Sequence, residues 1–328
     1  MVDLSTKYMG LNLKNPIIVG SCGLTKSVEK IKDLEAKGAA AIVLKSLFEE
    51  QILNESNHLI HNSDIFNAYP EASDYIQNFT KSHSVDDYLK LIRDAKREVK
   101  IPIIASINCI SLSEWVNIAK DIESAGADGL EINIFFLPYN IDINGEGYEK
   151  LYFDIIEKIK KSIKIPIALK IGYYFSSLVN TVQKLSWTGI DSLVMFNRFL
   201  NPDINIDTMK IHPSGIYSTP NDLGIPLRWI ALLSDKVKCD ISATTGIHDS
   251  DAVIKQLLVG ATTTQICSTL YINGTKQIGA ILKGLAQWME EHNYKSISDF
   301  RGKLSINKIG DPVLFHRVQY MKNLSEVE

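Results

Sequence analysis

Eight short apolar segments, spread along the whole chain, constrain its fold more than any other feature. A strand that is buried on both faces reads as a continuous Val/Ile/Leu run, as strands of parallel sheets do. Eight such strands alternating with helices predict an α/β fold, specifically a (β/α)8 TIM barrel. The segments are Pro16–Val19, Ala40–Leu44, Pro102–Ile107, Leu130–Ile134, Pro166–Leu169, Ser192–Phe196, Asp240–Ala243 and Thr263–Ile266.

Amphipathic stretches separate these segments, and several of them end at a glycine, which tolerates the left-handed backbone that closes a helix. Gly38, Gly126, Gly189 and Gly260 each stand between such a stretch and an apolar segment. The expected helices are Val28–Ala36, Val85–Val99, Ser113–Ser124, Tyr148–Ser162, Ser177–Leu185, Pro226–Leu233, Asp251–Leu258 and Gly279–Glu291.

The length of 328 residues fits one barrel with insertions, because a barrel typically takes about 250 residues. We therefore expect a single domain over residues 1–328. The segment around Leu11–Leu13 is predicted to form an N-terminal hairpin that closes the bottom of the barrel. Two long polar segments, Ser46–Thr80 and Asn197–Asp222, follow the second and sixth strands and are expected to be loops at the carboxyl-terminal face. Aromatic residues in the first of them favour a lid.

Composition and charge exclude several classes of function. The formal net charge is −3 and there is no basic block, so nothing favours nucleic acid or an anionic membrane as a partner. We find neither a signal peptide nor a membrane-spanning apolar run, and expect a cytoplasmic protein. The four cysteines form no CxxC pair and the seven histidines are scattered, so no metal site is expected.

Polar side chains stand at the ends of several predicted strands, where barrel enzymes carry their chemistry. Lys45 and Lys170 end the second and fifth strands, and either could stabilise negative charge on a reduced flavin or could simply extend to solvent. Asn108, Asn133 and Asn197 end the third, fourth and sixth strands. Their amides suit an imide or carboxamide edge, although a single asparagine commonly caps its own loop.

Small hydroxyl residues follow the last two strands. Thr244, Thr245 and Gly246 follow the seventh strand, and Ser268 and Thr269 follow the eighth. The loops after these strands commonly form a phosphate site in barrels, and tight turns are the alternative explanation for such residues. Together with the lysines and asparagines they indicate a site for a flat, polar, anionic cofactor.

In these strand-end residues and in the motifs around them, the chain resembles the class 1 dihydroorotate dehydrogenases, which are FMN-dependent barrel enzymes. The resemblance extends from about Leu4 to Leu304, and it rests on an ordered set of short motifs rather than on any single one. The motifs are Gly10–Pro16, Leu44–Ser46, Glu131–Asn133, Ala168–Lys170, Thr245–Ile247, Gly260–Thr262 and Tyr294–Phe300.

The resemblance implies FMN as cofactor and a role for each matching position. Lys45 would contact both flavin and substrate, and Asn67, Asn133 and Asn197 would bind the substrate. Ser21, Cys22 and Gly23 would line the flavin ring through their backbone, with Ser46, Asn108, Asn133 and Lys170 also at the flavin. The phosphate would be held by residues of the last two turns, Thr244, Thr245, Gly246, Ser268 and Thr269.

The chain departs from the family at the catalytic base. Family members read Asn-Leu-Ser-Cys-Pro-Asn after the fourth strand, with Cys (or Ser elsewhere) as the base, where this chain has Asn133-Ile-Phe-Phe-Leu-Pro138. When the family motif is aligned with residues 133–138 without a gap, Phe136 stands at the position of the base. A phenyl ring cannot accept a proton. We therefore expect slow oxidation of dihydroorotate and a faster rate after Phe136→Cys. The alternative is a shifted loop in which Phe136 is ordinary packing.

Three functions stay open at this point. The first is an FMN oxidoreductase of the dihydroorotate dehydrogenase type, acting on dihydroorotate or a related cyclic amide in pyrimidine biosynthesis. The second is a barrel aldolase or isomerase that uses Lys45 or Lys170 as a Schiff-base amine. The third is a diverged flavoprotein that acts as an electron-transfer or binding subunit. The family implies a homodimer, and the cysteines offer no iron–sulfur set, so use of NAD through a cluster would need a partner chain.

Overall fold

The computed structural model describes residues 2–48, 71–108, 115–198, 201–310 and 315. Within them, eight parallel strands close into a barrel in the order β3, β4, β6, β7, β8, β9, β12 and β13, after which β13 pairs back to β3. All eight predicted strands are confirmed. The strands are β3 (Ile17–Val19), β4 (Ala41–Val43), β6 (Ile103–Asn108), β7 (Gly129–Asn133), β8 (Ile167–Ile171), β9 (Ser192–Met195), β12 (Asp240–Thr244) and β13 (Thr263–Ile266).

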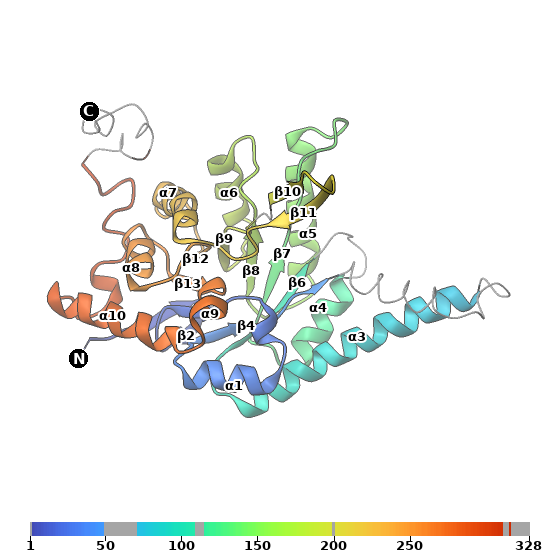
Figure 1. Ribbon diagram of the computed structural model, residues 1–328, viewed down its shortest axis with the longest axis horizontal. Helices are drawn as coiled ribbons and strands as arrows, with labels where there is room; N and C mark the ends of the chain where they lie inside the picture. The colour runs from blue at the N-terminus through green and yellow to red at the C-terminus, as the bar shows by residue number, and fades with distance from the viewer. Residues whose placement is uncertain (1, 49–70, 109–114, 199–200, 311–314, 316–328) are drawn as a thin grey trace.

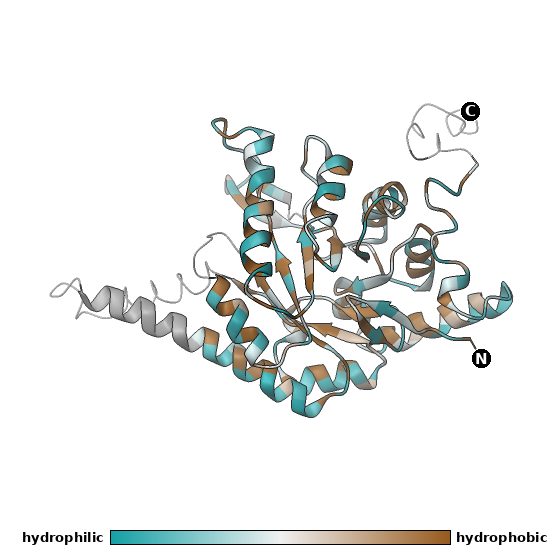
Figure 2. Ribbon diagram, turned by 180° about the vertical axis from the view of Figure 1, so that it is seen from behind, coloured by the Kyte–Doolittle hydropathy of each residue, from teal (hydrophilic) through white to brown (hydrophobic). Residues whose placement is uncertain are grey.

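Helices surround the strands (Figure 1). Figure 2 shows brown, apolar strands inside and helices that are teal on their outward faces, as expected for helices that bury one stripe against a sheet. The helices are α1 (Val28–Ala36), α3 (Glu71–Glu98), α4 (Trp115–Ser124), α5 (Gly145–Lys160), α6 (Leu178–Ser186), α7 (Gly224–Leu233), α8 (Ser250–Leu258), α9 (Ser268–Asn273) and α10 (Gln277–Glu291). Short 3₁₀ helices are η1 (Gly23–Thr25), η3 (Pro220–Leu223) and η4 (Ile297–Asp299).

The N-terminal hairpin is confirmed and forms the floor of the barrel. Its strands β1 (Thr6–Tyr8) and β2 (Leu11–Leu13) pair antiparallel. Tyr8, Met9 and Leu13 are buried in a small apolar cluster with inward-facing strand residues such as Ile18 and Val194. A second, much larger cluster fills the space between the strands and the helices. The hairpin thus covers the amino-terminal end of the barrel interior with apolar side chains.

Two of the long segments differ from expectation. Helix α3 begins at Glu71, so residues 71–80, expected in the loop, are helical, and the segment 71–98 contains neither Gly nor Pro to interrupt it. The segment 197–222 contains a hairpin of β10 (Asn201–Asn205) and β11 (Lys210–Ser214), which the sequence analysis missed. A two-residue strand, β5 (Leu47–Phe48), pairs with β6. The expected lid lies mostly outside the described residues.

The expectation of one domain over residues 1–328 stays a prediction, because the described residues form the barrel but leave gaps. Among the described helices, none has the length and apolar character needed to cross a membrane.

Candidate active site at the carboxyl-terminal mouth

The strand register brings three of the predicted site residues side by side. Asn108 on β6 pairs with Asn133 on β7, and Asn133 pairs with Lys170 on β8. Partners in a parallel ladder present their side chains to the same face. The Asn197 side-chain amide, just after β9, donates a hydrogen bond to the Asn133 amide oxygen. The asparagines and one lysine are therefore gathered at one mouth, as predicted.

Below this ring lies a buried ionic group. The ammonium of Lys170 lies 3.8 Å from a carboxylate oxygen of Glu131, whose side chain is 1% exposed. The other oxygen of Glu131 accepts a hydrogen bond of 2.7 Å from the Gln265 amide. One oxygen of Glu131 and the amide oxygen of Gln265 are buried without a hydrogen-bond partner. Because unpaired buried acceptors cost free energy, this floor suits a ligand that brings N–H donors.

A cavity of about 220 Å³ opens above this group, on the β8, β9, β12 and β13 side of the mouth. Six of the residues that line it were expected at the site: Lys170, Asn197, Thr244, Thr245, Gly246 and Ser268. The cavity also exposes Arg198, which adds a second cation to the lining. Two cations, amides and hydroxyls around one cavity favour an anionic, polar ligand.

The turn after β12 has a strained backbone. Thr245 and Gly246 both have positive φ, +80° and +77°, and threonine rarely adopts this conformation. A Cβ atom on Gly246 would lie 2.3 Å from the backbone nitrogen of Leu223, so only glycine fits where the two backbones pass. The Thr245 hydroxyl donates to the Phe196 carbonyl and holds the turn against β9. Strain of this kind often marks a functional turn.

The two hydroxyls after β13 have different surroundings. Ser268 lines the cavity, where its hydroxyl accepts a hydrogen bond from the Ser218 backbone N–H. Thr269 is fully buried, and its hydroxyl donates to the His248 carbonyl. The Ser268 hydroxyl therefore faces the site, whereas the Thr269 side chain ties β13 to the turn after β12.

The opposite side of the mouth is formed by residues after β3 and β4. The hydroxyls of Ser21, Ser46 and Ser106 form a chain with spacings of 3.0 Å and 2.7 Å. The Ser46 backbone N–H also donates to the Ser21 hydroxyl. Lys45, the residue before Ser46, is half-buried. The serine chain therefore holds the backbone next to Lys45 against the turn after β3.

Phe136 lies away from the cavity described above. Its ring makes an edge contact with Tyr152 of α5, with centroids 5.8 Å apart, and Tyr152 in turn contacts Phe175. These three rings border a separate, apolar cavity of about 300 Å³. Phe136 is therefore part of an aromatic cluster between the loop after β7 and α5. Asn67, expected to bind substrate, lies outside the described residues.

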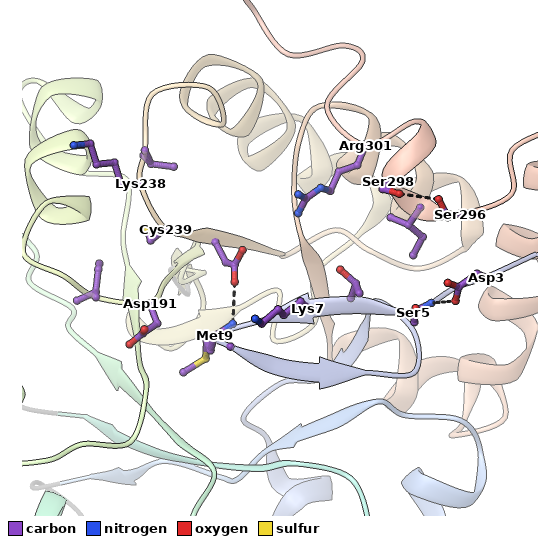
Figure 3. A pocket seen from close by; sticks show the side chains of 16 residues that line it. Asp3, Ser5, Lys7, Met9, Asp191, Lys238, Cys239, Ser296, Ser298 and Arg301 are labelled. Carbon is purple, nitrogen blue, oxygen red and sulfur yellow. Dashed lines mark hydrogen bonds between the residues drawn. The ribbon is translucent and has the colours of Figure 1, made fainter.

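A cavity of about 860 Å³ lies at the other end of the barrel. Figure 3 shows its lining, which includes the cations Lys7 and Arg301 and the carboxylates Asp3 and Asp191. Asp240 there accepts a hydrogen bond of 2.9 Å from the Met9 backbone and so fastens the floor hairpin to β12. Mixed charge at the amino-terminal face of a barrel is typical of structural contacts, since barrel chemistry occurs at the carboxyl-terminal face.

Sequence reasoning missed four groups at or near the mouth. Glu131 was noted only as part of a motif, and Gln265, Arg198 and His248 were not singled out. Glu131 and Gln265 are each a polar residue inside an otherwise apolar strand. That signal was overlooked because the strands were identified as continuous apolar segments. The His248 ring nitrogen lies 3.3 Å from the Ser218 hydroxyl, a contact between loops that the sequence gives no means of foreseeing.

Taken together, a closed (β/α)8 barrel with a polar, cationic mouth defines the class of barrel enzymes that bind anionic ligands at the strand ends. The comparison with known families is more specific. The family model for dihydroorotate dehydrogenase matches residues 3–289, and the chain belongs to that family.

Curated relatives agree with this assignment. The chain is 26% identical over 312 residues to the catalytic subunit of dihydroorotate dehydrogenase B (NAD(+)) from Thermoplasma acidophilum, covering 92% of this chain and 99% of the relative. It is 25% identical over 318 residues to dihydroorotate dehydrogenase A (fumarate) from Lactococcus lactis, covering 92% and 99% respectively. The low identity makes this chain a divergent member.

Proposed function

We propose that this protein is an FMN-dependent oxidoreductase that oxidises dihydroorotate or a closely related cyclic amide. The family assignment favours this function over the Schiff-base aldolase and over a binding subunit without catalysis. The observation that carries the proposal is the single cavity on which Lys170, Asn197, Thr245, Gly246 and Ser268 converge.

The residues present fit FMN in three respects. The buried oxygens of Glu131 and Gln265 that lack partners would be satisfied by a ligand with an N–H donor, such as an imide. Lys170, 12% exposed and 3.8 Å from Glu131, retains N–H donors for a second acceptor. The Thr245–Gly246 turn and the Ser268 hydroxyl would hold the phosphate through backbone and side-chain donors.

Bound FMN supplies the acceptor for a hydride taken from the saturated carbon of the substrate. The protein's own part is to bind and orient. The Asn133 and Asn197 amides, joined by a hydrogen bond, would fix the polar edges of a cyclic amide, and Lys45 would neutralise its carboxylate. Lys170 would stabilise the negative charge that builds up beside it during reduction.

The proton that leaves the neighbouring carbon needs an acceptor other than Phe136. General-base catalysis typically contributes about 10²–10⁴-fold to a rate, so its absence would make dihydroorotate a slow substrate. The oxidation rate of a related cyclic amide with a more acidic proton would be lowered less by the missing base. The substrate class is therefore proposed as dihydroorotate and its ring analogues.

The test is a substrate screen on the purified protein. FMN is identified by absorbance and by mass spectrometry of the released cofactor, and its anaerobic reduction is then followed with dihydroorotate, dihydrouracil and related cyclic amides. Reduction by at least one of them supports the proposal. A protein that takes up no FMN, or an FMN protein that none of them reduces, would contradict it.

A further inference from the structure

Two cysteines meet at the junction of the first and last barrel strands. β13 and β3 are paired in register up to Ile266 and Val19, and the Gly20 N–H donates to the Ile266 carbonyl at 3.1 Å. Cys267 follows Ile266 directly, and Cys22 lies three residues after Val19. The Cys267 thiol donates to the Ser21 carbonyl oxygen at 3.9 Å, one residue before Cys22. Both are free thiols and partly exposed, and Cys267 also lines the candidate site.

The sulfur of Cys22 is surrounded by donors. The Thr25 backbone N–H in η1 donates to the Cys22 side chain. Hydrogen bonding from Cys267, Leu24 and Tyr271 also lowers the pKa of the Cys22 thiol. Donors that converge on one sulfur favour its anionic form, which is the form that reacts as a nucleophile. Hydrogen bonding from Cys267 above all, opposed in part by burial, lowers the pKa of Cys22 to about 7.

The pKa of the Cys267 thiol is shifted in the opposite direction. Its hydrogen bond to Cys22 and its burial raise its pKa well above the ordinary value for a thiol. The charged groups that act on it are Glu131, which adds to this effect, and Lys170, which opposes it. The pair therefore contains one sulfur suited to attack and a neighbouring thiol suited to resolve the product.

We propose that Cys22 and Cys267 form a peroxide-sensitive thiol pair that closes into a disulfide, with Cys22 as the attacking sulfur. The Cys22 thiolate attacks one oxygen of a hydroperoxide, an S–O bond forms, the O–O bond breaks, and the leaving oxygen takes a proton. The Cys267 sulfur then attacks the Cys22 sulfenic acid, an S–S bond forms, and the S–O bond breaks to release water. Two thiols lose two electrons and the peroxide gains them.

This inference is independent of the proposed function, since it requires neither FMN nor a substrate. It places a modification site at the edge of the candidate active site, where a cross-link would join the ends of β3 and β13. Cys239 provides an internal comparison, because burial above all raises the pKa of its thiol to about 12.

The experiment uses the full-length protein as purified, carrying Cys109→Ser so that this further thiol cannot be oxidised. After hydrogen peroxide treatment without reductant, the intact mass should fall by two hydrogen atoms, and non-reduced peptide mapping should link Cys22 to Cys267. In Cys267→Ser, the reaction should stop at a sulfenic acid on Cys22 that dimedone traps. Cys239→Ser, the matched control, should form the disulfide as before.

A second readout does not depend on the variants. The rate of iodoacetamide alkylation at Cys22 should rise with pH and reach half its maximum near pH 7, because the thiolate is the reactive form, while Cys239 stays unmodified. An unchanged mass after peroxide, equal oxidation of Cys239, or an alkylation midpoint at Cys22 above that of an ordinary thiol, about 8.5, would each overturn the proposal.

Discussion

The Lys170 ammonium lies 3.8 Å from the Glu131 carboxylate inside the mouth of the barrel, with Glu131 1% and Lys170 12% exposed. The distance is longer than a hydrogen bond, so the pair interacts through charge while Lys170 keeps its donors for a ligand. Gln265 supports the carboxylate from the far side of the barrel. The group thus holds a cation in place directly beneath the candidate site.

We expect Glu131→Gln to lower the free energy of unfolding by about 1–3 kcal/mol, because it leaves a largely buried ammonium without its counter-charge. Urea denaturation measures the change. The matched control is Glu157→Gln, which breaks the exposed pair with Lys161 and should cost less than about 0.5 kcal/mol. Equal changes in the free energy of unfolding would show that the buried pair stabilises the protein no more than an exposed pair does.

Lys170→Ala should weaken FMN binding and slow flavin reduction, since the negative charge of the reduced flavin would lose its cation. The expected loss is on the order of 2–4 kcal/mol, by analogy with removal of an oxyanion donor. The dissociation constant of FMN and the flavin reduction potential measure it. Lys184→Ala, at an exposed position of α6, serves as control. Unchanged values for both quantities would mean that Lys170 is only a solvent-directed side chain.

Gly246→Ala should destabilise the protein by about 2 kcal/mol or more and impair FMN binding. An added Cβ would lie 2.3 Å from the Leu223 nitrogen at a left-handed backbone position. Nearby Gly224→Ala is the control: its Cβ meets nothing within 4 Å and its φ is −62°, so stability should hold or rise by about 0.5–1 kcal/mol. Thermal unfolding measures the stability of both variants. Wild-type stability of Gly246→Ala would show that the backbones of Gly246 and Leu223 do not pass as closely as described.

For Phe136→Cys, the structure reverses the expectation drawn from the sequence. The ring packs against Tyr152 and borders a cavity separate from the one that Lys170 lines. We expect the variant to lose about 1–3 kcal/mol of stability, the loss of a partly buried ring, and to reduce flavin at close to the wild-type rate. Stopped-flow kinetics with dihydroorotate provide the measurement, and a tenfold faster reduction would show that position 136 does reach the substrate.

The β10–β11 hairpin supports the expectation of a homodimer, which stays a prediction. Ile204, Ile206, Met209 and Ile211 are 61–86% exposed on it, an unusual density of apolar surface. Light scattering should give a dimer for the wild type and a monomer for Ile206→Asp/Ile211→Asp. Trp187→Asp, an exposed apolar position before β9 at the other end of the barrel, should leave the dimer intact. A wild-type monomer would contradict the prediction.

Sequence reasoning predicted the fold well because buried parallel strands carry a strong local signal, and every barrel strand was placed within two residues at each end. It also placed Asn133 and Lys170 at one mouth, which follows from the strand-end rule. The β10–β11 hairpin was missed because its turn lacks the usual Asn-Gly or Asp-Gly pair. The partnership of Glu131 with Gln265 was missed because it joins residues 134 positions apart, and no local pattern encodes such a contact.

The most direct test of the account is an anaerobic titration of the FMN-loaded protein with dihydroorotate, followed by flavin absorbance. The account predicts that dihydroorotate bleaches the flavin band in the wild type and bleaches it more slowly in Lys170→Ala. A flavin that stays oxidised in excess dihydroorotate and in every cyclic amide tested would contradict it.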